Sequence, residues 1–154
     1  MTGRPGYLCL ILHAHLPFVR HPEYPEFLEE NWLYEAITDT YLPLLDVLSG
    51  LEADGARFRL TMTLTPSLLA MFGDVLLRAR YVRYLEKRID LARAEEHRLR
   101  DDPAFGPLAA FYRERFKRAR DAFVHRHRQD LTAAFAGFQA RGSLEIITCA
   151  ATHG

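Results

Sequence analysis

Three short apolar runs, separated by longer stretches with helical spacing, set the pattern of this chain. The first run, 7–17, begins with apolar residues and ends with His13, His15 and a proline. The second, 58–64, and the third, 144–150, are rich in residues that favour strands. Short, continuous apolar runs are typical of strands buried on both faces. The pattern therefore predicts three strands, with the first one buried on both faces.

Between these runs, apolar residues recur every three or four positions, as in amphipathic helices. The segment 29–48 predicts a helix that Pro43 should kink or divide. The segment 65–98, with Thr65 as an N-cap, predicts a short helix and a longer one. One long helix should follow from about 104 to 138, closed by Gly142, with an inward stripe that includes Tyr112, Phe123, His127 and Phe135. Strands separated by helices pair in parallel through right-handed crossovers, so the fold class is α/β.

Histidines stand at the carboxyl ends of two predicted strands. His13 and His15 should project to the same side, because side chains alternate along a strand, and His153 follows the third strand. Parallel α/β folds bind ligands at this edge of the sheet. Three imidazoles could ligate zinc or hydrogen-bond a hydroxyl-rich substrate. Neither a cysteine cluster nor a carboxylate beside His13 or His15 completes a metal shell, which favours the substrate.

A long, proline-rich loop, 18–28, follows the first strand, and long loops at strand ends often serve function. Trp32, the only tryptophan, lies just after it. Its ring could stack on a sugar or pack on a neighbouring helix. Of the other histidines, His127 lies on an apolar stripe and should be a core or boundary residue. His97 and His125 should be at the surface.

Composition excludes several classes of function. The 154 residues carry 20 basic and 20 acidic side chains, so the chain should not bind nucleic acid or an anionic membrane through charge. No stretch approaches the roughly 20 apolar residues that span a bilayer. Cys9 and Cys149 lie in predicted strands and should be buried thiols, not a disulfide. A cytoplasmic, reducing compartment is therefore expected.

The chain offers no obvious catalytic pair. Glycosidases use two carboxyl groups across the scissile bond, but Glu145 lies at the wrong end of its strand. Glu29, Glu30 and Glu35 should be helix-cap or surface charges. No serine lies in a nucleophile elbow, and there is no glycine-rich phosphate loop.

The residues resemble a known family. Residues 12–19, Leu-His-Ala-His-Leu-Pro-Phe-Val, resemble the first motif of glycoside hydrolase family 57, His-x-His-x-Pro. Residues 29–38 and 40–45 are similar to the helix that follows in its 1,4-alpha-glucan branching enzymes. Residues 64–66 resemble their second strand end, and 142–154 their second motif, a strand that ends in histidine. The resemblance covers nearly the whole chain.

The resemblance implies that residues 1–154 form the N-terminal portion of a (β/α)7 TIM-like barrel catalytic domain. Such enzymes retain configuration, with a glutamate nucleophile and an aspartate acid/base on later strands. The chain would then contain no catalytic residue and be inactive alone, without cofactor or metal. His13, His15 and His153 would line the subsite of the cleaved sugar. The implied partners are alpha-1,4-glucans (glycogen, amylose, maltooligosaccharides) and the remainder of the barrel or a partner chain.

Several alternatives stay open. Amylases and 4-alpha-glucanotransferases of family 57 share these N-terminal motifs. Metal-dependent amidohydrolases also place His-x-His at the end of their first strand, where it binds zinc. A non-catalytic glucan-binding fragment is a further possibility. Because three parallel strands cannot close a barrel, the isolated chain should also expose apolar surface.

Overall fold

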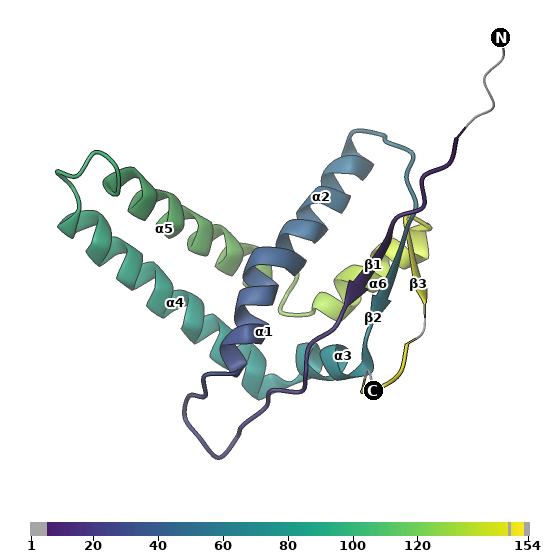
Figure 1. Cartoon of the computed structure of the whole chain (residues 1–154), viewed down its shortest axis with the longest axis horizontal. Helices are drawn as coiled ribbons and strands as arrows, with labels where there is room; N and C mark the ends of the chain where they lie inside the picture. Colours follow the sequence, from purple (N-terminus) through teal and green to yellow (C-terminus); the bar gives the residue numbers. More distant parts are fainter. Residues whose placement is uncertain (1–5, 148, 153–154) are drawn as a thin grey trace, which may run out of the picture.

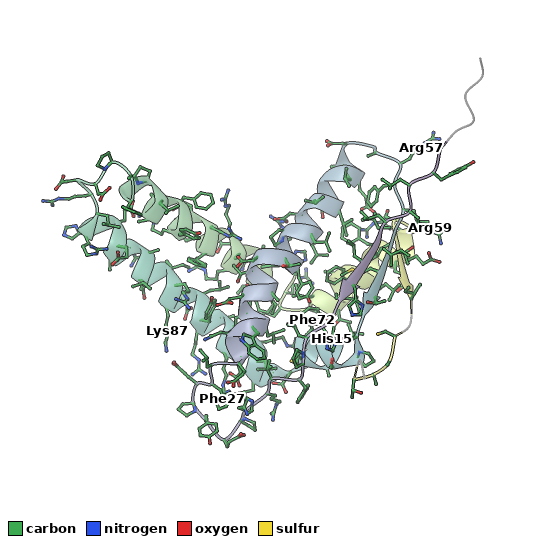
Figure 2. The ribbon with its side chains drawn as sticks, in the orientation of Figure 1. His15, Phe27, Arg57, Arg59, Phe72 and Lys87 are labelled. Atoms are coloured by element: carbon green, nitrogen blue, oxygen red, sulfur yellow. The ribbon has the colours of Figure 1, made fainter. Side chains whose placement is uncertain are left out.

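The computed structural model describes residues 6–147 and 149–152, and within them the strands form one parallel sheet (Figure 1). Its order is β1 (Ile11–Ala14), β2 (Leu60–Leu64) and β3 (Leu144–Ile147). The N-terminal ends of the strands lie together and their carboxyl ends lie together. Figure 2 shows this, with Arg59 and His15 at opposite ends of the sheet. The predicted α/β class with three parallel strands is confirmed.

Helical segments connect the strands, and two of them contain π-helical turns, η1 and η2. In Figure 1, α4 and α5 pack side by side as a hairpin that points away from the sheet, while α6 runs beside the sheet. None of the described helices is long and apolar enough to cross a membrane. The bounds are α1 (Glu30–Ala36), η1 (Ile37–Tyr41), α2 (Leu42–Ala53), α3 (Pro66–Gly73), α4 (Val75–Arg98), α5 (Gly106–Asp121), η2 (Ala122–Arg126) and α6 (Leu131–Arg141).

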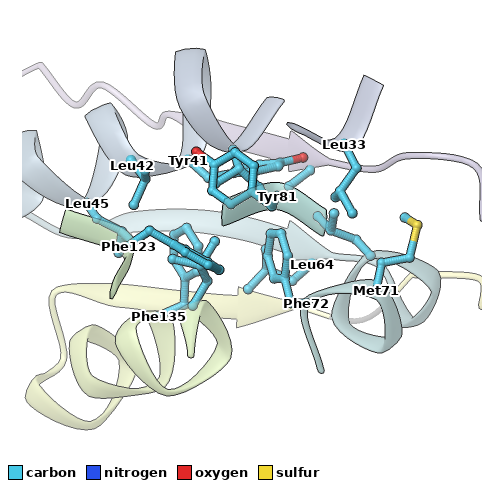
Figure 3. Packing of buried hydrophobic residues seen from close by; sticks show 14 of the residues in the cluster. Leu33, Tyr41, Leu42, Leu45, Leu64, Met71, Phe72, Tyr81, Phe123 and Phe135 are labelled. Carbon is cyan, nitrogen blue, oxygen red and sulfur yellow. The ribbon is translucent and has the colours of Figure 1, made fainter. Parts of the chain in front are cut away.

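The two faces of the sheet differ in chemistry. Ala14, Met62 and Leu144 point into a core that includes Leu45 and Phe135 (Figure 3). The alternate positions of each strand lie on the opposite face, which carries Ile11, His13, Thr61, Thr63, Glu145 and Ile147. The candidate site residues of β1 therefore belong to the face that the helices do not fill with apolar side chains.

The prediction that the first strand is buried on both faces is wrong. Ile11 is 59% exposed, because it lies on the face that the helices do not fill and β1 is the edge strand of the described sheet. Tyr7 and Cys9, which precede β1, are also exposed, and Cys149, also predicted to be buried, is only partly buried after β3. Cys9 and Cys149 are free thiols, as expected. The exposed residues of this strand also confirm the expectation of exposed apolar surface.

Helix boundaries follow local chemistry where caps are present. Thr65 caps α3 and Asp74 caps α4, each through a side-chain oxygen that accepts a backbone N–H. The predicted helix 29–48 is divided at η1, because Pro43 has no N–H to donate to the carbonyl of Asp39. The helix ends at Asp54 and Gly55, and Gly55 has a φ of +71°.

The prediction of one helix over 104–138 is wrong. The chain leaves the helix after η2, where Arg128 and Gln129 have φ values of 51° and 61°, and Asp130 then caps α6. The inner stripe residues Phe123 and Phe135 are buried as expected, but Tyr112 is 42% exposed. His127 is half-buried at this break and burial lowers its pKa, in agreement with a boundary position. His97 and His125 are exposed, as predicted.

Candidate functional site

His13 and His15 lie side by side at the carboxyl end of β1. Their ring centroids are 6.1 Å apart and their planes differ by 24°. The extended backbone that alternation requires therefore continues through both residues. This confirms the predicted placement of the two imidazoles on one side of the strand.

Each histidine has a threonine partner on the neighbouring strand. The hydroxyl oxygen of Thr63 is 2.5 Å from His13 Nδ1, and that of Thr65 is 3.3 Å from His15 Nδ1. His13 is the register partner of Thr63, and the two-residue spacing repeats on both strands. Each imidazole is therefore held at Nδ1 by a buried threonine, which fixes the orientation of the ring.

Sequence reasoning missed Thr63 as a site residue and assigned Thr65 only a capping role. Both are buried, at 7% and 0% exposure. The available signal was the matching alternation of His-Ala-His and Thr-Leu-Thr at the ends of successive parallel strands. Buried β-branched partners hold the imidazoles in fixed orientations, which a preorganised site needs.

The His15 end of the pair is also fixed to α3. Thr65 Oγ1 accepts the N–H of Leu68 at 3.4 Å and lies 3.2 Å from the hydroxyl of Ser67. Ser67 in turn donates to the carbonyl of Leu16 at 3.1 Å. The chain after β1 and the first turn of α3 therefore form one hydrogen-bonded unit.

Of the other two predicted site residues, the structure describes Trp32 but not His153. His153 lies outside the described residues, so its relation to the histidine pair remains a prediction. Trp32 lies in the first turn of α1 and is 49% exposed, on the side of the helix away from the buried Leu33 and Tyr34. Within the described part of the chain, no three histidine, cysteine or carboxylate side chains are grouped to hold a metal ion.

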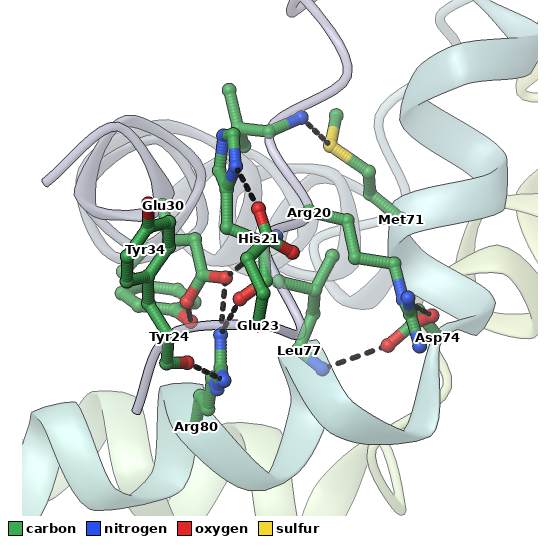
Figure 4. Close-up of polar contacts among 11 residues, drawn as sticks. Arg20, His21, Glu23, Tyr24, Glu30, Tyr34, Met71, Asp74, Leu77 and Arg80 are labelled. Atoms are coloured by element: carbon green, nitrogen blue, oxygen red, sulfur yellow. Dashed lines mark hydrogen bonds and ion pairs between the residues drawn. The ribbon is translucent and has the colours of Figure 1, made fainter. Parts of the chain in front are cut away.

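Glu30, predicted to be a cap or surface charge, is instead buried at 1% exposure (Figure 4). It pairs with Arg80 of α4, which is also buried. Its carboxylate accepts the N–H of His21 at 3.1 Å and the hydroxyl of Tyr34 at 2.9 Å. Burial and this bond to Glu30 raise the pKa of Tyr34, so the phenol remains a donor.

The same pair anchors the loop 18–28. Arg80 donates to the carbonyl oxygens of His21, at 3.1 Å, and of Tyr24. A second anchor precedes it, where Arg20 Nε donates to Asp74 Oδ2 at 2.6 Å. The loop that follows the histidine pair is therefore attached to α4 by a buried ion pair and a partly exposed one, and the exposed pair of Glu26 and Lys87 adds a third contact.

The Arg20–Asp74 anchor should depend on pH. Partial burial opposes ionisation of Asp74, but the hydrogen bonds from Leu77 and Arg20 outweigh it and lower the pKa. A carboxyl with a lowered folded-state pKa stabilises the fold above its unfolded pKa, and this stabilisation is lost as the pH falls below about 4. We expect Asp74→Asn, which keeps a capping oxygen, to lower the free energy of unfolding at pH 7 by no more than about 1 kcal/mol.

Urea unfolding at pH 7 and pH 3 measures this effect. The difference between the wild-type chain and Asp74→Asn should shrink at pH 3. Asp130→Asn, at the cap of α6, is the control for loss of a capping charge. An equal difference at both pH values for Asp74→Asn would contradict the assignment.

The sequence of this chain is similar to those of known proteins. Residues 9–154 match the sequence profile described as Glycosyl hydrolase family 57. The chain is 31% identical over 150 residues to the 1,4-alpha-glucan branching enzyme TK1436 of Thermococcus kodakarensis. This alignment covers 97% of the chain and 21% of the relative.

Two solved structures of known enzymes are similar to this chain in fold and in sequence. The alpha-amylase AmyC from Thermotoga maritima is 44% identical with a TM-score of 0.87, over 94% of this chain and 27% of that one. The GH57-type branching enzyme from Pyrococcus horikoshii is 32% identical with a TM-score of 0.88, over 97% of this chain and 28% of that one. The chain thus spans about a quarter of the length of these relatives.

The three parallel strands and their helices match the N-terminal part of the barrel in these structures. The family match is to glycosyl hydrolases and not to the metal-dependent amidohydrolases that the sequence left open. The chain belongs to glycosyl hydrolase family 57.

Proposed function

We propose that residues 1–154 form the N-terminal part of the catalytic barrel of an alpha-glucan-active enzyme, and that the activity is 1,4-alpha-glucan branching. The observation that carries this proposal is the histidine pair, fixed by buried threonines at the carboxyl end of a parallel sheet. The 31% identical branching enzyme of T. kodakarensis supports the choice of reaction. The role would be in glycogen or alpha-glucan metabolism, in the cytoplasm.

In this proposal the chain binds and orients the sugar, while the reacting carboxyl groups come from elsewhere. The imidazoles of His13 and His15 would hydrogen-bond sugar hydroxyls, and His153 would add a third imidazole. Trp32 would stack on a neighbouring glucosyl unit. Such contacts accelerate a reaction when they strengthen as the ring distorts toward the oxocarbenium-like transition state.

Hydrolysis is the second candidate, and a specific observation supports it. AmyC, which is named an alpha-amylase, is 44% identical to this chain, against 32% for the P. horikoshii branching enzyme. Branching passes the glycosyl group to a 6-hydroxyl, and hydrolysis passes it to water. The sugar-binding surface described above serves either acceptor, so the choice between them needs an activity measurement.

The 154-residue chain should bind linear alpha-1,4-glucans without transforming them. On titration with maltoheptaose, the imidazole signals of His13 and His15 in nitrogen-15 NMR should shift, with half-saturation at about millimolar ligand, typical of weak association. The signal of exposed His97 is an internal control and should not move. Proton NMR of a parallel incubation with amylose should show no new alpha-1,6 linkages.

Two outcomes would contradict this proposal. Branching by the isolated chain would mean that it contains the reacting carboxyl groups. Stoichiometric zinc bound at His13 and His15, with imidazole signals that do not shift when maltoheptaose is added, would show that these residues form a metal site and not a sugar site.

A further inference from the structure

A cavity lies away from the histidine pair, between the α4–α5 hairpin and the exposed side of α1 and η1. Its volume is about 500 Å³, large enough for an organic ligand of several rings. In Figure 1 the hairpin points away from the sheet, so this cavity does not belong to the site at the strand ends. Four aromatic side chains line it: Tyr84, Phe105, Tyr112 and Phe116.

The aromatic rings of the cavity are unusually accessible. Phe105 is 57% exposed and Tyr112 is 42% exposed, although the stripe in the sequence predicts that Tyr112 packs inward. Leu91 and Leu108 on the same walls are also about half exposed. Clustered apolar surface of this kind marks an interaction site more often than isolated exposed residues do.

Polar groups line the same cavity with nearly balanced charge. Asp39 of η1 and Arg115 of α5 form an ion pair of 2.5 Å across it. The guanidinium of Arg88 lies 4.9 Å from the centroid of the Tyr84 ring. Glu35 lines the cavity one turn before Asp39. Opposite charges of similar number do not favour a phosphate or a nucleic acid.

This combination matches the chemistry of a pyranose sugar. The C–H face of the ring is apolar and can stack on an aromatic side chain, while its hydroxyls can bind carboxylates and guanidinium groups. An apolar helix docked at the same place would bury Glu35, Asp39 and Arg88 away from water, which costs free energy. The lining therefore favours a neutral, polyhydroxylated ligand.

We infer that this cavity, bounded by α4, α5 and η1, is a second binding site for an alpha-1,4-glucan chain. The inference rests on the proposed function. Trp32 lies three residues before Glu35 on α1, about 4.5 Å along the helix axis, so a glucan stacked on Trp32 is near one end of the cavity. Two sites on one chain hold a polymer more tightly than either alone, because the second contact is intramolecular.

Tyr112→Ala tests the inference, and Phe111→Ala is its matched control. Phe111 is the preceding residue on α5 and is 49% exposed, but it does not line the cavity. Maltoheptaose should shift backbone amide NMR signals of α4, α5 and η1. Tyr112→Ala should weaken binding measured at these signals about five- to tenfold, as loss of a central aromatic contact does, and Phe111→Ala should leave it unchanged.

The outcomes separate this inference from the proposed function. Shifts at His13 and His15 without shifts along α4 and α5 would overturn the second site and leave the proposed function standing. Shifts at the hairpin that Tyr112→Ala does not weaken would also overturn it. Sedimentation that shows self-association through Tyr112, with no competition by maltoheptaose, would assign the cavity to a second copy of the chain. Hairpin shifts that Tyr112→Ala removes, with the histidine signals unmoved, would support the second site and count against the proposed role of the histidines.

Discussion

Replacement of Arg80 by methionine should lower the free energy of unfolding by about 3–5 kcal/mol, the usual cost of removing one partner of a buried ion pair. Glu30 would keep its bonds from His21 and Tyr34 but lose the guanidinium beside its carboxylate. The carbonyl groups of His21 and Tyr24 would also lose the bonds from the guanidinium, although the carbonyl of His21 keeps the N–H of Tyr24. The variant leaves a buried negative charge and weakens the anchor of the loop 18–28.

Urea unfolding followed by circular dichroism measures this loss. Arg83→Met is the matched control on the same helix, and because Arg83 is exposed its cost should stay within about 0.5 kcal/mol. In the double variant Glu30→Leu with Arg80→Met, both charges are absent, so stability should recover relative to Arg80→Met. Equal effects of Arg80→Met and Arg83→Met would contradict a structural role for the pair.

The parts of this fold that depend on local chemistry could be predicted from the sequence. Thr65 before Pro66, and Asp74 after Gly73, carry capping signals within a few residues of the helices they begin. The shared side of His13 and His15 follows from strand alternation alone. These features need no knowledge of what lies across the fold.

The parts of the fold that depend on contacts between distant residues could not be predicted from the sequence. Its place in the first turn of a helix predicts that Glu30 is a cap or surface charge, and only its pairing with Arg80, fifty residues later, makes it a core residue. The break between α5 and α6 was missed because Arg128 and Gln129 adopt positive φ without being glycine. Burial of β1 was overestimated because the rule for parallel strands presupposes helices on both faces of the sheet, and the described helices fill only one.

The solved structures that resemble this chain belong to enzymes of two activities. An alpha-amylase and a branching enzyme match the same region with TM-scores of 0.87 and 0.88. We expect a segment that superposes equally well on both to serve a step that the two reactions share, and in our proposal that step is binding of the glucan.

The histidine pair should therefore matter to either reaction, and a chimera can measure how much. This chain would replace the region that it matches in the P. horikoshii branching enzyme, about 28% of that protein. In the chimera, His13→Ala should lower kcat/KM about 10²- to 10³-fold, as loss of one preorganised hydrogen bond at a reacting centre does. Most of the loss should fall on kcat, because the contact strengthens in the transition state.

His97→Ala in the same chimera is the control, because His97 is an exposed histidine on α4. Thr63→Val removes the hydroxyl beside His13 Nδ1 while preserving side-chain shape, so it should cost less than His13→Ala but act in the same direction. That graded order separates an oriented imidazole from a merely structural one. If His13→Ala raised KM and left kcat unchanged, the imidazole would bind ground state and transition state equally, and its proposed catalytic contribution would be wrong.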